Sequence, residues 1–197
     1  MNTAPTLKYC VIAPAGSGKS TVAKLLKEEI ERHGLSCDII KLAEPLYRLQ
    51  EAFYRTAGID ISRYQQNHQL LEGIADTLRA LNPHSIVDDF LSRYRASTAS
   101  AVVNDDLRDA NVDWPVLREL GFTTIMVRAS VNVRAVRLAA RGDLQVSATS
   151  KLDAGVNAID HDIVIDNDDC SLQDLVDKVR TIVNREVEHF TRTGQGT

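Results

Sequence analysis

Residues 11–20 read VIAPAGSGKS and are the most informative segment of the chain for its fold class. It nearly matches the phosphate-binding loop motif G-x-x-x-x-G-K-[ST], with Ala13 in place of the first glycine. Pro14 forces the residue before it into an extended conformation, so position 13 needs no positive φ and tolerates alanine. Gly16 and Gly18 let successive backbone N–H groups point into one concavity, where the following helix N-terminus adds positive charge. The stretch therefore predicts a phosphate-binding loop.

The residue types in the loop assign its chemistry. In this motif the lysine reaches the β- and γ-phosphates of a nucleotide, and the Ser/Thr hydroxyl is a ligand of Mg²⁺. We therefore predict a catalytic role for Lys19 and a metal-binding role for Ser20. The residues of the loop predicted to bind ATP are Ala15, Gly16, Ser17, Gly18, Lys19, Ser20 and Thr21. The alternative is a surface Gly-Ser turn, which would not need the apolar strand before it and the amphipathic helix after it.

Strand and helix patterns alternate along the chain. Apolar runs predict strands at 8–13, 37–43, 100–105, 123–129 and 161–166. Helical patterns are found at 20–33, 45–94 with breaks near Gly58 and Pro83, 114–120, 131–141 and 171–190. Strands separated by helices indicate an α/β fold: a three-layer parallel sheet with helices on both faces.

Composition limits the function classes. A chain of 197 residues with 44% hydrophobic residues predicts one domain with one well-filled core. The net charge of -4 argues against stable nucleic-acid binding, and no apolar run is long enough to predict a membrane span. The three cysteines lack metal-binding spacing, so we expect reduced thiols and a cytoplasmic protein. Residues 191–197 are predicted to be a disordered tail. The sequence does not determine the oligomeric state, and a homodimer is one possibility.

An arginine-rich segment follows the fourth predicted strand. Arg134, Arg137 and Arg141 are spaced three and four positions apart, so they share one face of a helix. Guanidinium groups suit phosphate oxygens, and clustered cations repel one another unless an anion compensates them. We predict that residues 130–150 form a lid that closes over ATP and that these arginines are catalytic. The alternative is a solvated basic helix face.

A second insertion and an acidic strand end point to an acceptor site. Residues 44–97 are predicted to form a helical arm that binds the phosphoryl acceptor. The third strand ends in VVNDDLRD (102–109), beside the predicted phosphate loop. We predict that Asp106 binds Mg²⁺ or the acceptor and that Arg108 flanks the acceptor phosphate, while Asp105 belongs to a turn.

The chain resembles the deoxynucleoside monophosphate kinases of bacteriophages over most of its length. The similarity lies in KLAEPLYRLQEAF (41–53), NHQLLEGIADTLRALNPHSIVDDFL (67–91), NDDLRDAN (104–111), MVR (126–128) and DIVIDNDDCSLQDL (162–175). This resemblance implies an acceptor site that contains Arg79, Asp106, Arg108 and Arg128. It also implies that Asn167 lies near the adenine of ATP.

The expected activity is ATP-dependent phosphoryl transfer to a (deoxy)nucleoside monophosphate, giving the diphosphate. The acceptor oxygen of such a substrate is already ionised, so catalysis would consist of positioning and charge neutralisation. Tyr47, Phe53 and Tyr64 are candidates for the wall that disfavours a ribose hydroxyl. Two alternatives stay open. One is a kinase of a small or modified-base hydroxyl acceptor, with Asp106 as the base, and the other is a non-catalytic nucleotide-binding regulator.

Overall fold

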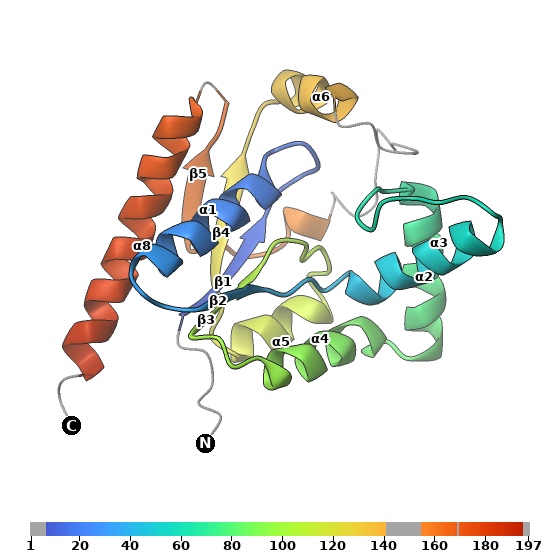
Figure 1. Ribbon diagram of the computed structural model, residues 1–197, viewed down its shortest axis with the longest axis horizontal. Coiled ribbons are helices and arrows are strands. Elements are labelled where there is room, and N and C mark those ends of the chain that lie inside the picture. Colours follow the sequence, from blue (N-terminus) through green and yellow to red (C-terminus); the bar gives the residue numbers. More distant parts are fainter. Residues whose placement is uncertain (1–6, 141–154, 169, 195–197) are drawn as a thin grey trace.

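Five parallel strands form the centre of the molecule, and helices cover both faces (Figure 1). The computed structural model describes residues 7–140, 155–168 and 170–194. The strands are β1 (Leu7–Ile12), β2 (Cys37–Ile39), β3 (Ala101–Asn104), β4 (Thr123–Arg128) and β5 (Ile163–Asp166), in the spatial order β2-β3-β1-β4-β5. The described helices are α1 (Lys19–Arg32), α2 (Glu44–Thr56), α3 (His68–Leu81), α4 (Ser85–Ala96), α5 (Asp113–Glu119), α6 (Val131–Ala140) and α8 (Leu172–Gly194).

Side chains of β1 alternate between two hydrophobic cores. Tyr9 and Val11 are buried with residues of α1 and α8 on one face of the sheet. Cys10 and Ile12 are buried on the other face, in a core that includes residues of α2, α3, α4 and α5. Burial on both faces explains why β1 is a continuous apolar run rather than an alternating pattern. The three-layer α/β fold predicted from the sequence is confirmed.

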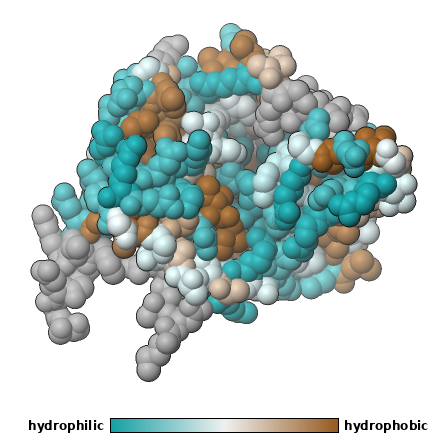
Figure 2. Space-filling view, viewed as in Figure 1, coloured by the Kyte–Doolittle hydropathy of each residue, from teal (hydrophilic) through white to brown (hydrophobic). Residues whose placement is uncertain are grey.

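The long helical segment after β2 divides where the sequence predicted breaks. Gly58 adopts a positive φ of 74° just after the end of α2. The Asn67 side chain accepts a hydrogen bond from the Leu70 N–H at 3.1 Å, and so caps the start of α3. Figure 1 shows α2 and α3 projecting to one side of the sheet. Figure 2 shows the molecule from the same direction: most residues on the visible face are hydrophilic, and the hydrophobic ones form separate patches.

Two predicted boundaries need correction. The second strand ends at Ile39 rather than at residue 43, because the N–H groups of Leu42 and Ala43 donate to the Asp106 carboxylate instead of to a neighbouring strand. Helix α8 extends through residue 194, into the stretch predicted to be a disordered tail, while 195–197 lie outside the described residues. The second half of the predicted lid, including Arg141, also lies outside them. Within the described ranges, no helix combines the length and apolar character needed to cross a bilayer.

Candidate functional site

The phosphate-binding loop connects β1 to α1. Gly16 and Gly18 have φ values of 80° and 99°, in the left-handed region that glycine reaches without a steric penalty. Ala13 is fully buried and, among the described residues, no non-glycine residue has a positive φ. This confirms that the variant first position is compatible with the loop. The Lys19 ammonium group donates to the Ala13 carbonyl at 2.5 Å and to the Pro14 carbonyl at 3.2 Å.

One cavity joins the loop to the helical arm. It has a volume of about 930 Å³ and extends from the loop between α2, α3 and the chain that follows β3. The predicted site residues that line it are Ala15, Gly16, Gly18, Lys19, Ser20, Thr21, Arg79, Asp106, Arg108 and Arg137. Ser17 is fully buried and lies behind this surface. The structure therefore brings most of the residues predicted from separate motifs to one place.

Helix α6 packs directly on the loop. A Cβ atom added to Gly16 would lie 2.8 Å from the main-chain oxygen of Arg134, so only glycine fits beneath the helix. The Arg134 guanidinium donates to the Ala15 carbonyl at 3.4 Å. Arg137 donates through Nη2 to the Asn167 carbonyl at 3.1 Å, and its buried Nη1 has no hydrogen-bond partner in the described part of the chain. Because Arg137 also lines the cavity, a ligand bound there could accept a hydrogen bond from Nη1.

The carboxyl end of β3 carries two acidic residues in different surroundings. The Asp106 carboxylate accepts hydrogen bonds from the N–H groups of Leu42 (2.7 Å) and Ala43 (3.0 Å) and from Asn104 Nδ2 (2.8 Å). Burial raises the pKa of Asp106 above its ordinary value, although the charge of Lys41 and these backbone donors oppose the rise. Asp106 therefore connects the end of β3 to the chain just before α2 through hydrogen bonds. The sequence did not predict this role.

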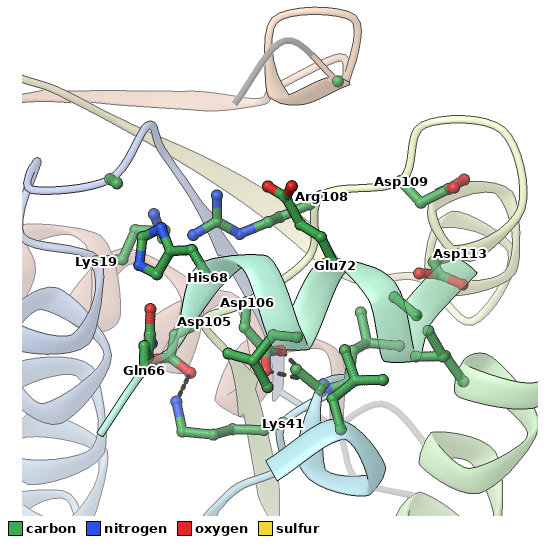
Figure 3. A pocket seen from close by; sticks show the side chains of 18 of the residues that line it. Lys19, Lys41, Gln66, His68, Glu72, Asp105, Asp106, Arg108, Asp109 and Asp113 are labelled. Carbon is green, nitrogen blue, oxygen red and sulfur yellow. Dashed lines mark hydrogen bonds and ion pairs between the residues drawn. The ribbon is translucent and has the colours of Figure 1, made fainter. Parts of the chain in front are cut away.

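Asp105 is the second acidic residue, and it forms a buried ion pair with Lys41 (Figure 3). Its side chain is only 3% exposed, yet it lines the cavity next to the loop. Burial alone would lower the pKa of Lys41, but the Asp106 and Asp105 carboxylates outweigh this and raise it. The sequence predicted a turn position for Asp105 and no role for Lys41. Their position after adjacent parallel strands was the available signal, because such strand ends meet at one edge of the sheet.

Arg79 lies in the cavity but is already paired. Its Nη2 donates to the buried Asp113 carboxylate at 2.7 Å, and its Nη1 lies 3.7 Å from Asp109. Burial raises the pKa of Asp113, and the hydrogen bond from Arg79 opposes that rise. Arg108 lines the cavity nearer the loop, and in Figure 3 its side chain points toward Lys19. Of these two arginines, the geometry gives Arg108 the position closer to the predicted transfer site.

Arg128, Arg134 and Asn167 also lie outside the lining of this cavity. Arg128 is exposed and lines a second cavity of about 500 Å³ at the carboxyl ends of β4 and β5, together with His161 and Asp168. This position separates Arg128 from the predicted acceptor residues. Asn167 is 4% exposed and lines neither cavity, and its side chain donates to the Ser17 carbonyl at 2.9 Å. It packs beneath the loop, where the burial leaves no open surface for a base.

Aromatic and amide side chains form the wall of the cavity on the arm. The rings of Tyr47 and Tyr64 pack edge to face with centroids 5.2 Å apart, and both residues line the cavity. Gln66, also in the wall, donates to the Tyr47 hydroxyl at 3.0 Å. Lys41 lies 5.5 Å from the centroid of the Tyr64 ring. Phe53, the third aromatic candidate, is 58% exposed and does not line the cavity.

A parallel sheet in this order, with a phosphate loop after β1 and helices on both faces, defines a P-loop kinase fold. The sequence profile of a family described as an AAA domain matches residues 10–158. The chain belongs to this AAA-domain family. A search among curated protein sequences gives no match.

Solved structures agree with the fold. A gluconokinase from Sinorhizobium meliloti 1021 is 18% identical with a TM-score of 0.51, covering 97% of this chain and 99% of that chain. The protein TT1252 from Thermus thermophilus is 19% identical with a TM-score of 0.52, covering 93% and 98%. A sugar kinase from a Janibacter species is 19% identical with a TM-score of 0.50, covering 91% and 95%. At these identities the likeness establishes the fold and not the substrate.

Proposed function

We propose that this protein transfers the γ-phosphoryl group of ATP to the phosphate of a nucleoside monophosphate, with a preference for the deoxy form. The observation that carries the proposal is the single cavity between the phosphate loop and the arm. Near the loop the cavity is lined by Lys19, Arg137 and Arg108, which could bind the phosphates of ATP and the phosphate of the acceptor. Farther along the arm, Tyr47 and Tyr64 offer apolar ring surface, which suits a planar base and a deoxyribose.

The transfer requires positioning and charge neutralisation. An ionised oxygen of the acceptor phosphate attacks the γ-phosphorus, the bond from that phosphorus to the bridging oxygen breaks, and ADP leaves with the electron pair. Lys19 would bind the β- and γ-phosphates, and Arg137 would donate from its buried Nη1 to the oxygens that gain charge. Arg108 would hold the acceptor phosphate. No general base is needed, because the attacking oxygen carries no proton.

Mg²⁺ fits the residues at the loop. Ser20 is exposed on the cavity surface, and Asp105 lines the same cavity, so a hydroxyl and a carboxylate oxygen are available as the hard oxygen ligands that Mg²⁺ prefers. The Asp106 oxygens already accept hydrogen bonds from Leu42, Ala43 and Asn104, which makes Asp106 the weaker candidate. When bound with ATP, the ion would neutralise phosphate charge.

The test is ADP formation with a panel of acceptors under identical conditions. The panel contains dTMP, dGMP, dCMP, dAMP and their ribose counterparts. We expect turnover with at least one deoxynucleotide and a preference of at most about 10²-fold over its ribose form, since an apolar wall rejects a hydroxyl only weakly. Equal efficiency with both sugars would remove the deoxy preference. No turnover with any monophosphate would contradict the proposal.

A hydroxyl acceptor is the second candidate, and the buried Asp105 favours it. A carboxylate next to the loop could accept the proton of an attacking hydroxyl group, as a general base. The acceptor end is also rich in carboxylates that would accept hydrogen bonds from a polyol, namely Glu72, Asp76, Asp109 and Asp113. Two structural neighbours are a gluconokinase and a sugar kinase. Adding gluconate, hexoses and nucleosides to the same panel separates the two candidates.

A further inference from the structure

The turn that follows β5, at residues 167 and 168, contacts both the phosphate loop and α6, the lid helix with which the predicted lid begins. Asn167, the first residue of this turn, makes three hydrogen bonds. Its side-chain Nδ2 donates to the Ser17 carbonyl at 2.9 Å, its main-chain N–H donates to the Arg128 carbonyl at 2.8 Å, and its carbonyl accepts from Arg137 at 3.1 Å. A single residue thus connects the loop, the end of β4 and α6.

The side-chain bond fixes the orientation of a peptide group in the loop. In a trans peptide the carbonyl and the following N–H point in opposite directions. Asn167 holds the Ser17 carbonyl, so the N–H of Gly18 faces away from Asn167. Gly18 lines the large cavity, where that N–H can bind a phosphate oxygen. A Cβ atom on Gly18 would lie 2.6 Å from Asn167 Nδ2, so the close contact depends on the glycine.

The same turn holds α6 at two points. The Asn167 carbonyl accepts from Arg137, and the neighbouring Asp168 carboxylate accepts from the Ser130 N–H at 2.5 Å, just before α6 begins. The hydrogen bonds from Ser130 lower the pKa of Asp168, so this carboxylate is charged at neutral pH. A negative charge at a helix N-terminus is favourable. The position of the lid helix is therefore tied to the turn that orients the loop.

We infer that Asn167 is a positioning residue that couples the phosphate loop to the lid, and that it does not contact the base of ATP. The role of Asn167 in positioning the loop for ATP rests on the proposed ATP-dependent phosphoryl transfer. Its hydrogen bonds to the loop and to α6 do not depend on that proposal. The side-chain amide sets the direction of the Gly18 N–H. The main-chain carbonyl of Asn167 holds Arg137 over the same phosphate site.

The test replaces Asn167 by alanine and measures two quantities. The first is amide hydrogen exchange in the ligand-free protein, over residues 16–21 and over α6. The second is the dissociation constant of MgATP, measured by calorimetry without an acceptor. We expect faster exchange in both segments and at least about tenfold weaker ATP binding, because a buried hydrogen bond to the loop is lost. Asn184→Ala is the matched control, since Asn184 lies on α8 and bonds to the exposed His33.

If Asn167→Ala does not fold, Asn167→Leu takes its place, because leucine keeps the branched shape and removes the donor without adding a charge. Affinity within twofold of the unmodified protein, with unchanged exchange over residues 16–21, would overturn the inference. Equally weakened binding of adenosine, which has no phosphates, would assign Asn167 to the base and would also overturn it. A protein that binds ATP but phosphorylates no acceptor would contradict the proposed function. The effect of Asn167→Ala on ATP binding and hydrogen exchange could still be interpreted in that case.

Discussion

The ammonium group of Lys19 lies within hydrogen-bond distance of two carbonyls of its own loop. A bound triphosphate would replace these contacts with stronger, charge-assisted ones. Arg137 is in a similar position, since one of its guanidinium nitrogens donates to Asn167 and another is buried with no hydrogen-bond partner among the described residues. Under the proposed function, both cations are positioned to bind phosphate oxygens.

Replacing Arg137 by alanine should lower kcat far more than it raises KM for ATP. The guanidinium would bind most strongly to the charge that develops on the transferred group, and loss of such an arginine costs about 10³-fold. Steady-state kinetics with varied ATP measures both constants. Arg118→Ala is the control, because Arg118 is exposed on α5 and pairs with Asp160. A rise in KM with unchanged kcat would show that Arg137 binds ATP equally well in the ground state and in the transition state, and so is not catalytic.

Replacing Asp106 by asparagine should destabilise the fold. The amide group would put a donor where the N–H groups of Leu42 and Ala43 now find acceptors, at a cost of about 1–3 kcal/mol. Thermal unfolding measures the change, with the exposed Asp60→Asn as control. Unchanged stability together with a large rise in the Mg²⁺ requirement would instead support the metal-binding role that the sequence predicted for Asp106.

At the scale of elements, the sequence predicted the identity of the strands and helices but not the contacts between them. The apolar run of β1 and the Gly-rich loop are local signals, so they could be interpreted directly. The early end of β2 depends on Asp106, which is distant in sequence from Leu42 and Ala43. For the same reason the sequence could not show that Arg79 is paired with Asp113, or that Lys41 is paired with Asp105.

Helices α2 and α4 of the arm are joined by a carboxylate whose pKa is shifted. Burial pushes the pKa of Asp89 upward, but hydrogen bonds from Arg48 and Arg93 outweigh it and lower the pKa below the ordinary value of 3.8. A lowered pKa in the folded state means that this contribution to stability is present above pH 3.8 and is lost as the pH falls through the folded value.

Asp89→Asn should therefore reduce the loss of stability on acidification below pH 3.8 relative to the unmodified protein. The measurement is the free energy of unfolding in urea as a function of pH. Asp88→Asn is the control at the next position, where the side chain is exposed. The free energy of unfolding could instead fall equally below pH 3.8 in Asp89→Asn and in the unmodified protein. That result would show that the contacts of Asp89 with Arg48 and Arg93 do not stabilise the arm.

At the scale of the molecule, strand order decides what the site contains. Because β3 pairs with β1, the acidic end of β3 lies beside the phosphate loop, and because β2 pairs with β3, Lys41 reaches the same edge. The sequence predicted the loop, the arm and the lid arginines as separate features. The loop, the arm and one of these arginines, Arg137, meet in one cavity because of the topology, which no local pattern encodes. The cavity supports a kinase rather than a nucleotide-binding regulator, which would need no acceptor pocket.

The most direct test of phosphoryl transfer follows the label of ATP carrying ³²P in the γ-phosphate. After incubation with the protein, Mg²⁺ and the deoxynucleoside monophosphate panel, the products are separated by chromatography. We predict that the label appears in a deoxynucleoside diphosphate, and that Lys19→Ala abolishes this product without unfolding while Lys24→Ala, exposed on the same helix, does not. Label that is found only in inorganic phosphate, or that stays in ATP with every monophosphate, would contradict the account.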